Sequence, residues 1–262
     1  MLSARAVKYL KYILFSRHGK GRGIHSPFVF DIVSRVFRNK TDPEIVLLIE
    51  NIRKRQISDR TEIEVLDLGS GSLASEGSIK RVSDITKYSS VPPVYGQLLY
   101  RMAQESGEPG IIEFGTSTGI STMYLAAGRP DTEVITMEGC PALSEIAARN
   151  FSSTGLNNII QIMGDFDDSL QEIKRRSVRP GLVFIDGNHK KEATVRYFRE
   201  MAAISGNETV IIIDDIHLTK EMEEAWEEIR KSENVSFTIS VFRMGMVFFR
   251  KGMSRFDYVI RY

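Results

Sequence analysis

The stretch Ile111-Ile-Glu-Phe-Gly-Thr-Ser-Thr-Gly-Ile-Ser121 decides the fold of this chain. An apolar run ends at Gly115, and a second glycine follows at Gly119. This pattern is typical of a buried strand that turns through glycine into a helix. Glycine lets the backbone approach a ligand closely, and the first turn of the helix presents free N–H groups. The sequence therefore predicts a ligand-binding strand, turn and helix here.

Further apolar runs follow, separated by segments with apolar residues at helical spacing. The runs cover residues 133–137, 159–163, 182–186 and 210–214. Such alternation indicates a parallel sheet with helices on both faces. Residues 236–242 and 246–250 indicate an antiparallel hairpin that turns near Gly245. We therefore expect an α/β fold with an open, doubly wound, mostly parallel seven-stranded sheet of the Rossmann-like type, closed by a C-terminal antiparallel hairpin.

The first part of the chain has a different character. We expect a helical extension over residues 1–88 and the main domain over residues 89–262. Pro43, preceded by Thr41 and Asp42, predicts the first turn of a capped helix. Through residue 40 the only acid is Asp31, against nine lysines and arginines. This basic extension is either a surface for an anionic partner or a helical lid whose apolar face docks on the main domain. We favour the lid, which could also form a homodimer contact.

Composition restricts the class of protein. The chain has 262 residues and a net charge of +1, which argues against a dedicated nucleic-acid binder. Its single cysteine excludes an intramolecular disulfide framework. No apolar run approaches the roughly 20 residues of a membrane span. These features predict a soluble, cytoplasmic protein.

The glycine turn does not match the common phosphate-binding loops. A dinucleotide fingerprint would need glycine at positions 117 and 120, where Ser117 and Ile120 stand. A phosphate-cradling loop would end in Gly-Lys-Ser/Thr, which is absent here. Glu113 instead places a carboxylate two residues before the first glycine. A carboxylate suits a cationic ligand without phosphate, such as S-adenosylmethionine with its ammonium group.

The stretch resembles the first motif of class I S-adenosylmethionine-dependent methyltransferases, in the O-methyltransferase branch of the catechol and caffeoyl-CoA enzymes. The resemblance covers Val91 to the C-terminus, and residues 92–99 resemble the helix before the first strand. It departs from the common acid-x-Gly-x-Gly-x-Gly pattern at Ser117. The resemblance implies that Glu138 holds the ribose hydroxyls, Asp165 accepts from the adenine amino group and Phe166 lies beside the ring. The full set of cofactor residues that it implies is Glu113, Gly115, Thr116, Ser117, Gly119, Ser121, Glu138, Gly139, Gly164, Asp165, Phe166 and Asp186.

Other segments have competing interpretations. Residues 65–72, Val-Leu-Asp-Leu-Gly-Ser-Gly-Ser, also look like a first motif, but a polar stretch follows them and we interpret them as an entry loop. The Pro92-Pro93 pair resembles an element of amino-methylating enzymes, but it precedes the first strand instead of following the fourth. Asp167 and Asp168 are interpreted as helix caps. Cys140 either lines the adenine side or packs in the core.

Carboxylates gather at the ends of two later strands. Asp186 ends one strand, and Asp214 and Asp215 end the next. Three anions at adjacent strand ends would repel each other, and a divalent hard cation such as Mg²⁺ would relieve that repulsion. The resemblance to metal-dependent O-methyltransferases assigns the same three residues as ligands. The alternative is that these aspartates cap helices, and many members of the family use no metal.

The implied reaction is transfer of a methyl group to a hydroxyl of a small molecule. His189 is the preferred general base and His217 the second choice, because a histidine pKa lies near working pH. Asp186 completes the expected catalytic set. Two alternatives remain: an RNA-modifying methyltransferase that uses the basic extension, and a protein that binds the cofactor without catalysis. The acid cluster favours an enzyme, because a pure binding module has no need of it.

Overall fold

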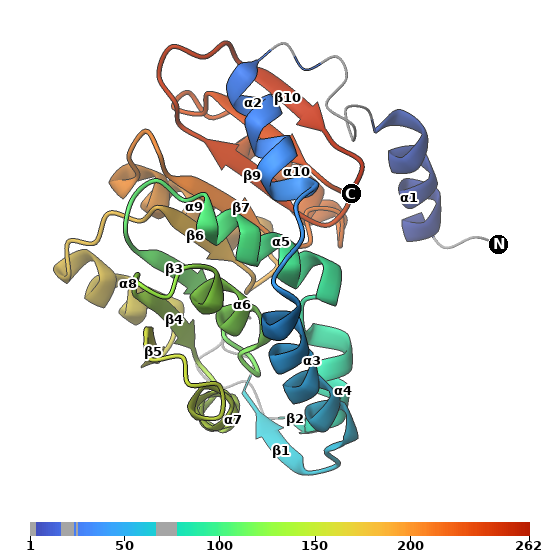
Figure 1. Cartoon of the computed structure of the whole chain (residues 1–262), viewed down its shortest axis with the longest axis vertical. Coiled ribbons are helices and arrows are strands. Elements are labelled where there is room, and N and C mark those ends of the chain that lie inside the picture. The colour runs from blue at the N-terminus through green and yellow to red at the C-terminus, as the bar shows by residue number, and fades with distance from the viewer. Residues whose placement is uncertain (1–3, 17–23, 25, 67–77) are drawn as a thin grey trace. The chain divides into compact units, whose positions relative to one another are not determined.

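The computed structural model describes residues 4–16, 24, 26–66 and 78–262, and it is shown in Figure 1. The chain forms two compact units. We call residues 40–104 and 109–178 the central unit, and residues 1–39, 105–108 and 179–262 the C-terminal unit. Each unit is described by itself. The expected division after residue 88 stays a prediction. Most of the second glycine motif, from Asp67, lies outside the described residues.

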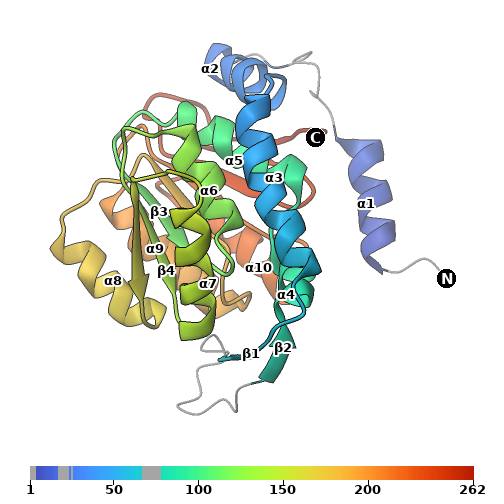
Figure 2. The ribbon, with the colours of Figure 1, turned by 60° about the horizontal axis from the view of Figure 1, so that its bottom comes forward.

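The central unit contains the strand that opens the alternating half of the sequence. Strands β3 (Ile111–Phe114), β4 (Val134–Glu138) and β5 (Ile159–Met163) pair in parallel in that order. Every residue of β3 and β4 is buried. The helices are α6 (Ile120–Gly128), α7 (Pro141–Ser152) and α8 (Phe166–Arg175). Figure 2 shows α7 and α8 on opposite sides of β4. The predicted parallel strands with helices on both faces are confirmed here.

Three more helices complete the central unit. They are α3 (Pro43–Ser58), α4 (Val82–Ser89) and α5 (Pro93–Gln104), with a short antiparallel pair β1 (Glu62–Val65) and β2 (Ser78–Arg81). The predicted cap before Pro43 is Asp42, whose carboxylate accepts from the Glu44 N–H at 2.9 Å. Arg101 of α5 donates to the Thr41 hydroxyl at 2.6 Å. This buried bond fixes the start of α3 against α5.

The C-terminal unit contains the remaining strands, in the order β10-β8-β9-β7-β6. Strands β6 (Leu182–Ile185) and β7 (Val210–Ile213) are parallel, with α9 (Lys191–Ile204) and α10 (Lys220–Ile229) after them. Strands β8 (Phe237–Ser240) and β9 (Gly245–Phe248) form the predicted antiparallel hairpin. Strand β10 (Phe256–Val259) pairs in parallel with β8, so strands β3 to β10 number eight, against the seven expected for the main sheet.

The hairpin turns at residues 241–244, not at Gly245. Gly245 is the first residue of β9, where it lies against a buried ring. A Cβ atom at Gly245 would come within 2.5 Å of the Trp226 ring of α10. The glycine is therefore needed for close packing of β9 and not for the turn.

The N-terminal helices belong to the C-terminal unit. They are α1 (Ala4–Phe15), α2 (Pro27–Ile32) and a π-helical turn, Val33–Phe37. The buried Tyr12 hydroxyl donates to the Ile260 carbonyl at 2.6 Å and accepts from the Tyr262 N–H at 2.8 Å. Lys8 pairs with Glu223 at 2.8 Å. Helix α1 is therefore docked on the unit to which it belongs, and its role as a lid stays a prediction.

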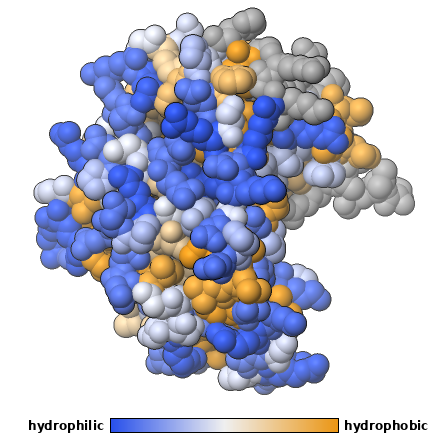
Figure 3. All heavy atoms as spheres, viewed as in Figure 1, coloured by the Kyte–Doolittle hydropathy of each residue, from blue (hydrophilic) through white to orange (hydrophobic). Residues whose placement is uncertain are grey.

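Hydrophilic side chains cover most of the face shown in Figure 3. Among the described residues, we find no helix that combines the length and the apolarity needed to cross a bilayer.

We expect Gly128→Ala to destabilise the chain, because Gly128 lies at the contact between α5 and α6. A Cβ atom there would come within 2.4 Å of the Tyr100 carbonyl oxygen. Overpacking of this kind costs about 1–3 kcal/mol. Chemical denaturation measures the loss. Gly206→Ala is the control, because its Cβ would meet only the Thr209 hydroxyl at 4.0 Å. Equal midpoints for both variants would contradict this account of the α5–α6 contact.

Candidate functional site

The glycine turn after β3 requires a left-handed backbone at several positions. Gly115, Ser117 and Gly119 have φ angles of 96°, 49° and 85°. The N–H groups of Gly115 and Thr116 donate to the Met137 carbonyl at 3.1 and 3.0 Å. A Cβ atom at Gly119 would come within 2.5 Å of the Phe151 ring. The turn is thus held against β4 and α7, and α6 begins directly after it at Ile120.

Glu113 is a carboxylate inside the core. Its side chain is 0% exposed. Its Oε2 atom accepts hydrogen bonds from the hydroxyls of Thr122 and Thr136, no well-formed hydrogen bond reaches its buried Oε1 atom, and the Ser121 hydroxyl lies close enough to interact with the carboxylate. Burial raises the pKa of Glu113 to about 7, although the hydroxyl bonds oppose that shift. A carboxylate that lacks a partner at one oxygen retains an acceptor for a cationic donor.

Glu138, at the end of β4, holds the turn together. Its Oε2 accepts from the Ser117 N–H at 2.7 Å, and its Oε1 accepts from the Cys140 N–H at 2.9 Å. Burial raises the pKa of Glu138, and the backbone N–H bonds oppose that shift. Each carboxylate oxygen has a second lone pair, so both could still accept from a ligand hydroxyl. The sequence did not predict the bond to Ser117, which links Glu138 to the glycine turn.

The segment after β5 corrects one interpretation. Asp165 is the cap of α8, because its carboxylate accepts from the Asp168 N–H at 2.8 Å. Asp167 and Asp168 lie in the first turn of the helix and do not cap it. The next residue, Phe166, packs edge-on against Phe114 with ring centroids 5.5 Å apart. Gly164 has a φ angle of 152°. The capping bond uses Oδ1 of Asp165, so its role toward adenine remains a prediction.

Cys140 packs in a small hydrophobic cluster with Ile85 and Leu143. Its thiol lies 3.6 Å from the Glu64 carbonyl oxygen. The packing interpretation of Cys140 therefore accounts for its burial.

In the C-terminal unit, the three predicted carboxylates do come together. Strands β6 and β7 pair in parallel with Ile185 opposite Ile213, so Asp186 and Asp214 leave the sheet side by side. Burial raises the pKa of Asp186 well above its ordinary value, and the neighbouring Asp214 raises it further. Asp215 has a φ angle of 50°, which is uncommon for a residue other than glycine.

Arg243 contacts this acid cluster, which we define as Asp186, Asp214 and Asp215. Its Nε lies 2.8 Å from both carboxylate oxygens of Asp214, and its Nη2 lies 2.5 Å from Oδ2. The same Nη2 lies 3.3 Å from Asp215 Oδ2. The Asp214 side chain is 0% exposed and that of Arg243 is 14% exposed. The guanidinium is therefore a buried counter-charge inside the cluster.

This arrangement does not fit a divalent cation. Both oxygens of Asp214 already accept from Arg243. Across the described residues, no group of three or more His, Cys, Asp or Glu side chains has a geometry that could hold a metal ion. The repulsion that motivated the Mg²⁺ prediction is relieved by a guanidinium instead. Metal binding by Asp186, Asp214 and Asp215 stays a prediction that these contacts do not support.

The two candidate bases have different surroundings. His189 Nε2 lies 3.8 Å from Asp186 Oδ1, and the His189 side chain is 34% exposed. His217 Nδ1 lies 3.1 Å from Glu223 Oε1, the same oxygen that pairs with Lys8. The His217 ring also lies 5.9 Å from the Phe242 ring. His189 is thus the histidine next to the acid cluster, whereas His217 is tied to α10 and α1.

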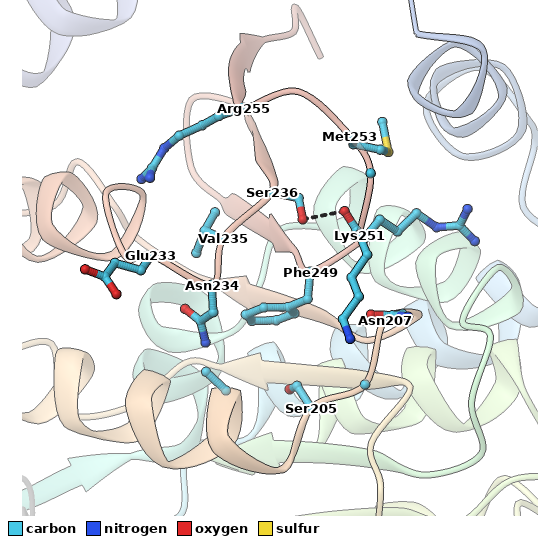
Figure 4. Close-up of a pocket in the computed structure, with 14 residues that line it drawn as sticks. Ser205, Asn207, Glu233, Asn234, Val235, Ser236, Phe249, Lys251, Met253 and Arg255 are labelled. Atoms are coloured by element: carbon cyan, nitrogen blue, oxygen red, sulfur yellow. Dashed lines mark hydrogen bonds between the residues drawn. The ribbon is translucent and has the colours of Figure 1, made fainter.

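A separate cavity of about 700 Å³ lies elsewhere in the C-terminal unit (Figure 4). Its lining includes Ser205, Asn207, Asn234, Phe249 and Lys251. Residues 205–207 precede β7, whereas Asp214 follows it, so the cavity lies at the other end of that strand. It contains none of the predicted site residues.

Sequence analysis missed Arg243, although a signal for it exists. Strand β9 pairs antiparallel with β7, with Gly245 opposite Ile213. Continued by two residues, that register sets Arg243 opposite Asp215. The Ile216 N–H donates to the Arg243 carbonyl at 3.1 Å, which extends the pairing past the strands. A basic residue two positions before β9 is the signal, but it can be used only when the register is known.

Comparisons with known proteins agree with these features. Residues 112–216 match the family described as methyltransferase domain. A catechol O-methyltransferase of Niastella koreensis is 31% identical over 130 residues, which are 48% of this chain and 58% of that protein. The O-methyltransferase imqG of Aspergillus flavus is 27% identical over 148 residues, 54% of this chain and 58% of that protein. The chain thus spans under two thirds of the length of these relatives.

Solved structures support the fold. An O-methyltransferase from Bacillus cereus in complex with SAH superimposes with a TM-score of 0.56 at 22% identity, covering 84% of this chain and 97% of that one. The O-methyltransferase TomG from Streptomyces achromogenes, in complex with SAM, gives 0.57 at 18% identity, with 85% and 96% covered. Residues 112–216 therefore match a methyltransferase domain, and the solved structures support the α/β fold that the sequence predicted.

Glu113 should make the stability of the ligand-free protein depend on pH. Its pKa is about 7 in the folded protein and 4.5 ordinarily, so the folded state binds more protons between these values. Stability is then full below pH 4.5 and falls as the pH rises to about 7, by roughly 3 kcal/mol at most. The raised pKa values of Glu138 and Asp186 also make stability fall as the pH rises. The contribution of Glu113 is therefore isolated by comparing the wild type with Glu113→Gln.

Urea unfolding at several pH values checks this prediction. From pH 5 to 7.5, Glu113→Gln should lose less stability than the wild type. Parallel stability curves for the two proteins would contradict a raised pKa at Glu113.

Proposed function

We propose that this chain is an S-adenosylmethionine-dependent methyltransferase that acts on a hydroxyl group of a small molecule. The observation that carries the proposal is the glycine turn with a buried carboxylate before it. Glu113 has a buried oxygen without a partner, and no Gly-Lys-Ser/Thr loop follows β3. Such a turn suits a cationic nucleoside better than a pyrophosphate. The methyltransferase domain match and the SAM and SAH complexes of similar structures support it.

Different residues of the central unit would bind different parts of S-adenosylmethionine. Glu113 Oε1 would accept from the ammonium group, and Glu138 would accept from the ribose hydroxyls through its remaining lone pairs. Phe166 and Asp165 would contact the adenine. An ammonium donor at Glu113 would also stabilise the ionised carboxylate, because a nearby positive charge offsets the cost of burying a negative one.

The C-terminal unit would supply the acid–base chemistry. S-adenosylmethionine, when bound, carries an electrophilic methyl group on a sulfonium. His189 would accept the proton of the acceptor hydroxyl, because a neutral imidazole is a general base and this one lies beside the acid cluster. Asp186, 3.8 Å from His189 Nε2, would stabilise the protonated ring. Much of the rate increase would then come from positioning of the acceptor oxygen.

A hydroxyl acceptor is favoured by the relatives. Two of them are called O-methyltransferases, one of them for catechol. In the C-terminal unit, Tyr9 of α1 also packs edge-on against Phe242, the residue before Arg243 in the sequence. We include no divalent cation in the reaction, because Arg243 already neutralises Asp214.

The RNA-modifying alternative is less well supported. Lys8 and Arg35 of the basic extension pair with Glu223 and Glu105, so these two cations would have to leave an acid to contact RNA. We therefore keep the small-molecule acceptor. RNA binding that weakens steeply with salt would favour the alternative.

Calorimetry tests the cofactor. We expect heat of binding with S-adenosylhomocysteine and none with NADH or ATP. Glu113→Gln should weaken binding by about tenfold or more, since a charge-assisted hydrogen bond contributes about 1.5–3 kcal/mol. Binding of NADH or ATP without S-adenosylhomocysteine would overturn the proposal.

Alanine variants of the two histidines test which of them is the general base. With a catechol-type acceptor, His189→Ala should lower kcat by about 10²–10⁴-fold, the usual contribution of a general base. His217→Ala should change kcat little, because Glu223 holds that ring. Both variants should bind S-adenosylhomocysteine as the wild type does. A large loss of kcat in His217→Ala alone would reverse the assignment.

A further inference from the structure

The acid cluster contains an internal cation. Arg243 contributes a guanidinium that meets Asp214 through two nitrogens, with distances from 2.5 to 2.8 Å. It reaches a second carboxylate, Asp215, at 3.3 Å. Guanidinium groups bind carboxylates in this forked manner because their donors lie in one plane. The guanidinium therefore bridges two carboxylates, as a bound metal ion would.

The backbone holds Arg243 in that position. The Arg243 carbonyl accepts from the Ile216 N–H at 3.1 Å, and the Val241 N–H donates to the Met244 carbonyl at 2.9 Å. The first bond ties the hairpin turn to the segment that follows Asp215, and the second closes the turn itself. The sheet register therefore places the backbone of Arg243 beside the aspartates that its guanidinium contacts.

A divalent cation and this guanidinium would compete. A bound Mg²⁺ lies about 2.0–2.1 Å from its carboxylate oxygens. A cation bound to Asp214 would therefore lie close to the guanidinium, and like charges repel strongly away from water. Asp214 is 0% exposed, so solvent does not screen that repulsion.

We propose that the Arg243 guanidinium takes the place of the divalent cation at Asp214 and Asp215, so that methyl transfer by this chain needs no metal. The inference rests on the proposed function for the reaction, but the occupancy of the acid cluster can be measured without activity. We assign Arg243 the role of a positioning residue. It neutralises the aspartates and holds their carboxylates next to Asp186.

Titration with Mn²⁺, followed by the loss of the free-ion electron paramagnetic resonance signal, tests this inference. The wild type should bind no Mn²⁺ at the acid cluster. Arg243→Ala should gain one site per chain, with a dissociation constant on the order of 10⁻⁴–10⁻³ M, in the range of weak sites for hard cations. Asp215→Asn added to Arg243→Ala should remove that site. Arg250→Ala is the matched control, because Arg250 pairs with Glu208 away from the acid cluster.

Loss of Arg243 leaves buried carboxylates without a counter-charge, so circular dichroism and thermal unfolding accompany the titration. Mn²⁺ should raise the Tm of Arg243→Ala and leave that of the wild type unchanged. Arg243→Gln keeps hydrogen-bond donors without the charge and is the second variant. Wild-type Mn²⁺ binding that Asp215→Asn removes would overturn the inference, as would folded Arg243 variants that gain no site. With an active wild type, chelator should leave the methyl-transfer rate unchanged.

Discussion

A carboxylate removed from water must be hydrogen-bonded, paired with a cation or protonated, and this constraint shapes both units. Glu113 and Asp214 both stand at or near the ends of buried strands, and both side chains are 0% exposed. Leaving either one charged and unpaired would cost several kcal/mol. The residues around each of them are therefore determined by electrostatics as much as by packing.

The two units meet this constraint differently, and the difference has chemical consequences. Around Glu113 the partners are neutral hydroxyls such as those of Thr122 and Thr136, which lower its pKa but do not cancel its charge, so burial still raises the pKa to about 7. Around Asp214 the partner is the guanidinium of Arg243, which cancels the charge directly. In the proposed function the first arrangement would accept a cationic ligand, whereas the second already contains its cation.

The sequence predicted elements better than contacts. Apolar runs that end in Gly or Asp marked the buried strands, because parallel strands covered on both faces must be apolar throughout. The cap of α8 was missed because Asp165, Asp167 and Asp168 are chemically equivalent candidates, and only the backbone shows which accepts from a free N–H. Arg243 was missed because its partners depend on the register of an antiparallel pair, which no local pattern specifies.

That register links the core to the chemistry of the acid cluster. A shift of one residue between β7 and β9 would turn every side chain of β9 to the other face and move Arg243 away from Asp215. Gly245 helps to prevent such a shift, because only a residue without a Cβ fits against the Trp226 ring at the position opposite Ile213. Any neighbouring residue of the hairpin would bring a side chain into that ring. The packing of a tryptophan on a glycine thus fixes which residue meets the aspartates, and we infer that the charge of that residue replaces a metal.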